Sequence, residues 1–228
     1  MMRAMTQSAT SSERPLRRDA ERNRQRILDA ARVVFAERGL AGSHDDIARE
    51  AGVGVGTVYR RFPDKELLID ALFEERMQEI ADVARDAVDN PDPWEALVSF
   101  LTRAQELQSH DRGLKELVLG GARGAERAVA ARALIVPLVA QVVERAKAAG
   151  VVRSDLDVSD LPLIQLAIGT IAESSRDVAP DVWRRMMALV LDGLRPECAQ
   201  TAFATPALDQ EQITAVMACY GANARRRG

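Results

Sequence analysis

Residues 42–68 read GSHDDIAREAGVGVGTVYRRFPDKELL, and this stretch decides the fold. It holds two short amphipathic patterns, and Gly52 between them can adopt the left-handed conformation that a tight turn requires. Ser43 is a good N-cap for the first pattern, and Asp64 is the expected cap of a longer helix that follows. Two short helices that meet at such a turn predict a helix-turn-helix over residues 43–62.

The apolar residues of this motif predict which side of its second helix faces solvent. Ile47, Ala48 and Val53 are expected to pack the first helix onto the second, where Val58 and Phe62 point inward. The outward positions are then Gly56, Thr57, Tyr59, Arg60 and Arg61. Thr, Tyr and Arg side chains contact bases or phosphates, and Arg is the commonest reader of guanine. The second helix is therefore predicted to lie in the major groove of DNA, although a generic helical pair with two solvated arginines would share this pattern.

Further basic residues flank the motif. Lys65 lies at the start of the next helix, where its charge and the exposed backbone N–H groups would bind one phosphate together. His44 fits either a phosphate contact or, as we favour, a partly exposed structural histidine. The polar residues 1–17 indicate a disordered arm, whose arginines would either reach into the minor groove or stay solvated.

Helical periodicity extends over the rest of the chain, and no strand pattern is apparent. Before the motif, a helix that starts near Arg18 has an apolar stripe made of Ile27, Leu28, Ala31, Val34 and Phe35. After the motif, helices are predicted at about residues 64–88, 93–108, 113–119, 125–149, 158–175, 180–194 and 210–220. The predicted fold class is all-α.

Composition and charge agree with a helical protein whose N-terminal part is basic and whose remaining part is acidic. Aromatic residues make up only 4% of the 228 residues, which favours helices over β-sandwiches. The net charge of −3 is unexpected for a nucleic-acid binder. However, residues 1–65 carry 13 basic and 9 acidic side chains, whereas residues 66–228 carry 18 and 25. This asymmetry indicates an N-terminal part that faces nucleic acid and an acidic body.

Catalytic and metal chemistry find little support in the sequence. His44 and His110 are the only histidines and Cys198 and Cys219 the only cysteines, which leaves no set of zinc ligands and no disulfide framework. No GxSxG motif or phosphate-binding glycine loop occurs. Neither a secretory signal nor a membrane-spanning run is apparent. We therefore predict a cytoplasmic protein that is not an enzyme, holds no cofactor or metal and contacts no membrane.

Three successive segments carry a resemblance to a known family. RILDAARVVFAERG, DDIAREAG and GVGVGTVYRRFPDKELL resemble, in order and spacing, the N-terminal domain of the TetR, or tetracycline-repressor-like, family. The resemblance covers about residues 20–70. It implies that this domain binds operator DNA as part of a homodimer.

The resemblance also implies roles for individual residues. Thr57, Tyr59 and Arg60 match the family's recognition contacts, and Ser43 and Lys65 match its phosphate contacts. With the outward glycine included, the predicted DNA-binding residues are Ser43, Gly56, Thr57, Tyr59, Arg60 and Lys65. This chain departs from the family pattern at residues 54–55, where Gly and Val replace polar residues. Specificity is therefore expected to rest on fewer side chains, or partly on DNA shape.

A weaker resemblance covers the C-terminal part. GVVRSDLDVSDLPLIQLAIGTIA followed by DVWRRMMALVLDGLRP looks like the last two long helices of TetR-type C-terminal domains, with the SbtR-like subgroup as a candidate. In that family these helices form a four-helix bundle across the dimer axis, and their neighbours hold an inducer pocket. Candidate bundle residues, unless they pack the core of one monomer, are Leu163, Ile164, Ala167, Ile171, Trp183, Met187, Val190 and Leu194. We assign no ligand-binding residue from the sequence.

These inferences combine into one expected organisation. It comprises a disordered arm (1–17), a three-helix helix-turn-helix domain (18–65), a helical-bundle ligand-binding and dimerisation domain (66–195) and a tail (196–228). The expected function is a homodimeric repressor that binds a palindromic operator in double-stranded DNA and is released by an unidentified small-molecule inducer. Two alternatives stay open: an activator or ligand-independent regulator on the same fold, and an all-helical protein-interaction module without DNA binding.

Overall fold

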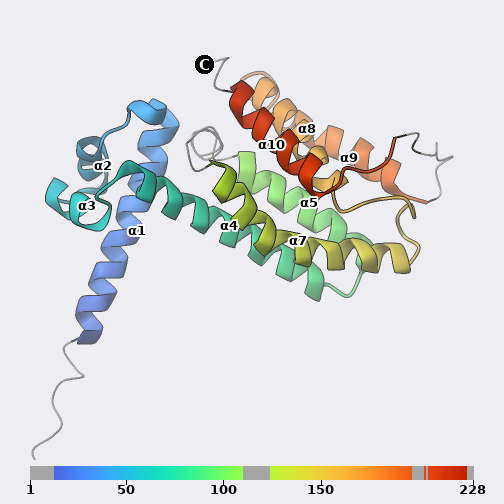
Figure 1. Cartoon of the computed structure of the whole chain (residues 1–228), viewed down its shortest axis with the longest axis horizontal. Coiled ribbons are helices and arrows are strands. Elements are labelled where there is room, and N and C mark those ends of the chain that lie inside the picture. The colour runs from blue at the N-terminus through green and yellow to red at the C-terminus, as the bar shows by residue number, and fades with distance from the viewer. Residues whose placement is uncertain (1–12, 110–123, 197–202, 204, 225–228) are drawn as a thin grey trace, which may run out of the picture. The chain divides into compact units, whose positions relative to one another are not determined.

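The computed structural model describes residues 13–109, 124–196, 203 and 205–224 (Figure 1). All regular elements within these residues are helices, which confirms the predicted all-α class. Contacts along the chain divide it into two units, one up to Leu72 and one from Phe73 onward. This division falls inside α4 (Lys65–Asp89), so one continuous helix contributes to both units.

The first unit holds the helix-turn-helix. Besides the start of α4, this unit contains α1 (Glu13–Arg38), the 3-10 turn η1 (Gly39–Ala41), α2 (His44–Ala51) and α3 (Val55–Arg61). The apolar stripe predicted on α1 is buried, and α1 packs against α2, which in turn packs against α3. The chain passes very close to α1 at Gly42, where a Cβ atom would lie only 2.6 Å from Val34 Cγ1. A residue larger than glycine would therefore force either the Val34 side chain or the chain at residue 42 to shift.

The start of α1 differs from the sequence expectation. The helix begins at Glu13 rather than near Arg18, so residues 13–17 are helical although we predicted them as part of a disordered arm. Glu and Arg are strong helix formers that need no apolar stripe, and Pro15 lies in the first turn, where proline is tolerated. The remainder of the predicted arm, residues 1–12, lies outside the described residues.

The second unit is a bundle of longer helices. After α4 it contains α5 (Pro93–Ser109), α7 (Gly124–Ala148), α8 (Asp160–Ser175), α9 (Val182–Leu194) and α10 (Gln210–Ala224). Its core is aliphatic, with Leu97 and Leu101 from α5, Val142 from α7 and Ile168 from α8 packed around Trp183 of α9. The helices lie within a few residues of the predicted positions. The short helix predicted at residues 113–119 lies outside the described part of the chain.

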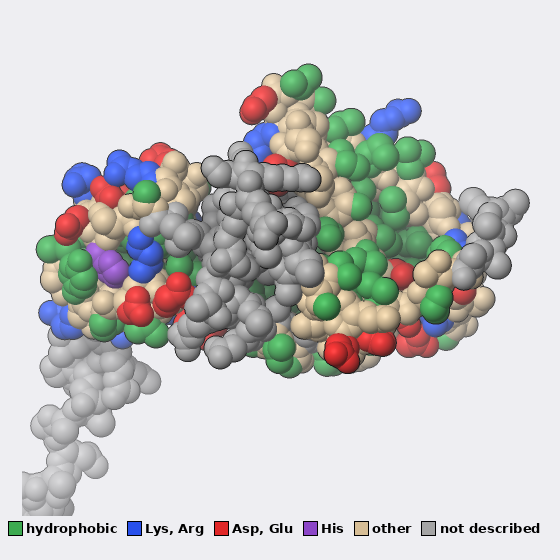
Figure 2. Space-filling model, turned by 45° about the horizontal axis from the view of Figure 1, so that its top comes forward, with side chains coloured by type: hydrophobic (Ala, Val, Ile, Leu, Met, Phe, Trp, Pro, Cys, Tyr) green, Lys and Arg blue, Asp and Glu red, His purple; other side chains and the backbone are tan. Residues whose placement is uncertain are grey.

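Both units carry charged side chains of both signs on the face shown in Figure 2, and exposed hydrophobic side chains cover more of the second unit. Exposed hydrophobic side chains on a folded domain often mark a binding surface. None of the helices in the described residues is long and apolar enough to cross a membrane.

Candidate nucleic-acid interface

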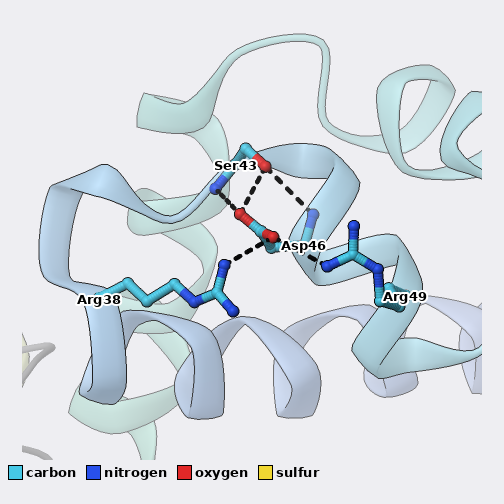
Figure 3. A network of polar contacts seen from close by, with 4 residues as sticks. All are labelled: Arg38, Ser43, Asp46 and Arg49. Atoms are coloured by element: carbon cyan, nitrogen blue, oxygen red, sulfur yellow. Dashed lines mark hydrogen bonds and ion pairs between the residues drawn. The ribbon is translucent and has the colours of Figure 1, made fainter.

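A reciprocal cap fixes the start of α2 (Figure 3). The Ser43 hydroxyl oxygen accepts a hydrogen bond from Asp46 N at 3.1 Å, and Asp46 Oδ2 accepts from Ser43 N at 3.1 Å. The Ser43 hydroxyl also donates to Asp46 Oδ2 at 2.7 Å. Ser43 is therefore the N-cap that the sequence predicted, within a complete capping box.

The Asp46 carboxylate is the centre of a small polar network. Its Oδ1 atom accepts from Arg38 Nη1 at 2.8 Å and from Arg49 Nη1 at 3.1 Å. The hydrogen bonds from Ser43, first from its side chain and then from its backbone, lower the pKa of Asp46 to about 2. Asp46 is thus negatively charged at neutral pH, and this charge lies at the positive end of the α2 dipole.

This network engages Ser43 fully. Its only hydroxyl proton and its backbone N–H both point at Asp46. The phosphate contact implied by the family resemblance would require the hydroxyl to leave a carboxylate oxygen. The structure gives Ser43 a capping role, and its phosphate contact stays a prediction.

The turn between α2 and α3 is built around Gly52. Its φ of +62° lies in the left-handed region, as the sequence indicated, and its N–H reaches the carbonyls that end α2. Arg26 Nη2 of α1 donates to Ala51 O at 2.8 Å and so ties the first helix to this turn. No local pattern indicates this contact, because Arg26 alternates with other arginines at the start of the helix. α1 therefore stabilises the turn that sets the direction of α3.

α3 exposes the face that the sequence predicted. Val58 is fully buried and Phe62 is buried just beyond the helix, whereas Gly56, Tyr59, Arg60 and Arg61 are exposed and Thr57 is half-buried. Cβ atoms built at Gly54 and Gly56 would meet no other atom within 4 Å, so the start of this helix is open to a partner. The result is a short helix with Thr, Tyr and Arg side chains on its outer side.

His44 connects α2 to the far end of α3. It is only 8% exposed, and its Nε2 atom lies 2.9 Å from the carbonyl oxygen of Phe62. A carbonyl can only accept, so Nε2 is the donor in this contact. The ring of His44 also stacks on that of Tyr59. The histidine is structural, as we favoured, but it is buried rather than partly exposed.

Lys65 is the first residue of α4 and is half-buried. Just before it, Asp64 Oδ1 accepts from Glu66 N at 3.2 Å, which confirms the predicted cap of this helix. The predicted DNA-binding residues therefore come from three places in one unit: the cap of α2, the outer side of α3 and the start of α4. Their DNA contacts themselves stay predictions.

The second unit contains a pocket of about 460 Å³. Its described wall is formed by α4, α5, α7, the start of α8 and α10, and it is mainly aliphatic. The lining includes Met77, Phe100, Ile135, Gln165, Ile213 and Met217. A pocket of this size and composition is typical of small-molecule sites.

Residues 27–72 match the family described as bacterial regulatory proteins, tetR family, and residues 92–196 match the transcriptional regulator SbtR-like C-terminal domain. The solved structure of a TetR transcription regulatory protein from Mycobacterium vanbaalenii is 36% identical to this chain. The likeness covers 79% of this chain and 99% of that one, with a TM-score of 0.62. The chain belongs to the TetR family.

Other relatives agree with this assignment. A TetR transcriptional regulator from Streptomyces coelicolor is 34% identical, with 77% of this chain and 99% of that chain covered and a TM-score of 0.60. An HTH-type transcriptional regulator of Staphylococcus aureus is 49% identical over 51 residues, which is 22% of this chain and 28% of that relative. These TetR-family matches are to regulators rather than enzymes, and they support DNA-binding regulation. The resemblance seen in the sequence, the SbtR-like C-terminal part included, is confirmed.

Proposed function

We propose that this protein is a homodimeric repressor that binds a palindromic operator through α3 and leaves it when a small molecule binds the second unit. The observation that carries the proposal is the exposed outer side of α3, held by a capped α2 and a glycine turn. This is the arrangement in which a helix-turn-helix places its second helix in the major groove.

The DNA contacts would be of two kinds, contacts to base edges and contacts to phosphates. Arg60 is exposed near the end of α3 and would read a base edge, as would Thr57. Tyr59 is 49% exposed and reaches out from the same helix. Gly56 lets the DNA backbone approach closely, because it presents no side chain. Lys65 would bind a phosphate at the N-terminus of α4, where backbone N–H groups add to its charge.

A homodimer would explain the hydrophobic surface of the second unit. α8 and α9 pack together, and Leu189 of α9 is 58% exposed. Of the predicted bundle residues, Trp183, Met187 and Leu194 are buried within one monomer and belong to its core. The others keep exposed surface for a partner: Leu163, Ile164, Ala167, Ile171 and Val190. A symmetric pair of these helices would present two α3 helices to the two half-sites of a palindrome.

Ligand release would act through α4. This helix begins beside the DNA-binding motif and continues into the second unit, where Met77 and Ile80 line the pocket. A ligand that displaces this part of α4 would shift the DNA-binding unit at its other end. A coupling free energy of about 1–3 kcal/mol would reduce operator affinity by roughly 5- to 150-fold.

Two measurements on the full chain test the proposal. Sedimentation equilibrium should give a dimer, and an electrophoretic mobility shift with genomic fragments at low salt should give discrete retarded bands. A protein that retards no fragment at any concentration would instead support the all-helical interaction module. A monomer that still binds DNA would refute only the dimer.

A further inference from the structure

We infer that the pocket of the second unit binds a neutral, largely apolar small molecule with one hydroxyl group, and that α10 forms part of the binding wall. This inference rests on the proposed function, because it names the ligand class of the proposed regulatory site. Gln165 is the proposed polar contact of the ligand. The C-terminal segment, which the sequence analysis describes only as a tail, becomes part of the binding site.

Gln165 of α8 places an unpartnered hydrogen-bond acceptor within the pocket wall. It is only 7% exposed and lines the pocket, and its Nε2 atom donates to Leu101 O of α5 at 2.8 Å. Because a carbonyl cannot donate, this contact fixes which end of the amide is the oxygen. The other end, Oε1, is buried and has no hydrogen-bond partner among the described residues. Such an acceptor costs free energy unless a donor reaches it, and a ligand hydroxyl would supply that donor.

The charged groups of the lining already have partners in the protein. Arg76 Nη1 donates to Glu79 Oε2 at 2.6 Å. Asp157 Oδ1 accepts from Ser159 N at 2.8 Å, and the Asp157 carboxylate also interacts with the positive charge of Lys147. Most of the remaining side chains that line the pocket are apolar, and they include Met77 and Ile135. A neutral ligand therefore fits this wall better than an ionic one, which would have to be desolvated without a free counter-charge.

α10 closes one side of the pocket. The SbtR-like match ends at residue 196, so the helix lies beyond it. The segment supplies Leu208, Gln210, Ile213, Thr214 and Met217 to the lining. Ile213 is 1% exposed, and α10 packs against α7. A helix that buries an isoleucine beside the pocket is part of its wall rather than a loose tail.

Two local contacts hold this segment in place. Asp209 Oδ1 accepts from Gln212 N at 2.8 Å, and Asp209 N donates to Gln212 Oε1 at 3.0 Å, which is a reciprocal cap at the start of α10. Earlier in the segment, the guanidinium of Arg153 lies 3.7 Å from the ring centroid of Phe203. This cation–π contact ties Phe203 to the body of the unit.

Calorimetric titration of the full chain with two isomers tests the polar contact. n-Octanol and methyl heptyl ether have the same atoms, but only the alcohol can donate a hydrogen bond. The alcohol should bind about tenfold more tightly, which is the ratio expected of one buried hydrogen bond. In Gln165→Met, which keeps the side-chain volume, this preference should disappear. Equal binding of both isomers to the wild type, no binding of either, or a preference that survives the substitution would overturn the assignment.

Two substitutions on α10 test its part in the wall. Ile213→Ala removes buried atoms beside the pocket, whereas Val216→Ala removes exposed atoms from the same helix. The first should weaken n-octanol binding roughly fivefold or more, and the second should leave it unchanged. Equal affinities in wild type and both variants would show that α10 does not contact the ligand. If Ile213→Ala fails to fold, Met217→Ala provides the same comparison.

These titrations contain no DNA, so their outcome does not depend on whether the protein binds an operator. A chain that binds n-octanol but retards no DNA would refute the proposed function alone. A chain that binds DNA but neither isomer would refute this inference alone.

Discussion

The imidazole ring of His44 stacks on the phenol ring of Tyr59, with the ring centroids 4.6 Å apart and the ring planes at 11°. Since His44 Nε2 also donates to Phe62 O, one buried side chain of α2 contacts both the outer side and the end of α3. The exposed Tyr59 ring is thus supported on one face by the ring of His44. His44 thus supports a residue that we propose to contact DNA.

Removing this support should affect stability and DNA binding together. We expect His44→Ala to lower the free energy of unfolding by about 1–3 kcal/mol, because the Phe62 carbonyl loses its donor. Operator affinity should fall as well, because Tyr59 loses its stacking partner. Urea unfolding and DNA titration measure the two effects. Tyr59→Phe keeps the stack and removes only the hydroxyl, so it separates the loss of stacking from the loss of a hydroxyl contact to DNA. Unchanged affinity in His44→Ala would remove the positioning role.

The capping box should make part of the stability depend on acid pH. The pKa of Asp46 is lowered in the folded protein from 3.8 to about 2, chiefly by the hydrogen bond from the Ser43 side chain. A lowered folded-state pKa stabilises the fold above the unfolded-state value, and this stabilisation is lost as the pH falls from about 4 towards about 2. Unfolding of wild type and Asp46→Asn should therefore differ less at pH 2 than at pH 5. Parallel stability curves over this range would argue against the assignment.

Arg60 should contribute to the sequence specificity of DNA binding. If it reads a base, Arg60→Ala costs about 1–3 kcal/mol on the operator and relaxes specificity at one base pair. Competition titrations with operators altered at single positions measure this. Arg61→Ala, at the neighbouring exposed position, is the control. An equal loss on all sequences would reassign Arg60 to a phosphate contact.

Lys65 should act on affinity but not on specificity. Lys65→Ala should weaken binding to all sequences alike and reduce the slope of log K against log salt by about one. Titrations at several salt concentrations give this slope directly. A slope equal to that of the wild type would mean that Lys65 binds no phosphate.

Much of the first unit could be predicted from the sequence because its signals are local. The stripe that ends in Phe35, the cap at Ser43 and the turn at Gly52 each depend on a few neighbouring residues. The His44–Tyr59 stack could not be predicted in this way, since it depends on how α2 crosses α3. The contact of Arg26 with the turn is equally a matter of tertiary packing.

The second unit shows the limits of sequence patterns more strongly. Its helices could be located from periodicity, but the pocket combines side chains from distant segments, such as Ile135, Gln165 and Ile213. The contribution of α10 could not be predicted, because its weakly amphipathic sequence follows a stretch without an apolar stripe. An unpartnered amide oxygen such as Gln165 Oε1 has no sequence signature at all.

We propose above all that the outer side of α3 reads DNA. The most direct measurement is selection from a pool of random duplexes, with sequencing of the bound fraction, for the wild type and for a variant with Thr57→Ala and Arg60→Ala. We predict that the wild type enriches a palindromic motif and that the variant loses or broadens it. An identical motif for both proteins, or no enriched motif for the wild type at low salt, would contradict the claim.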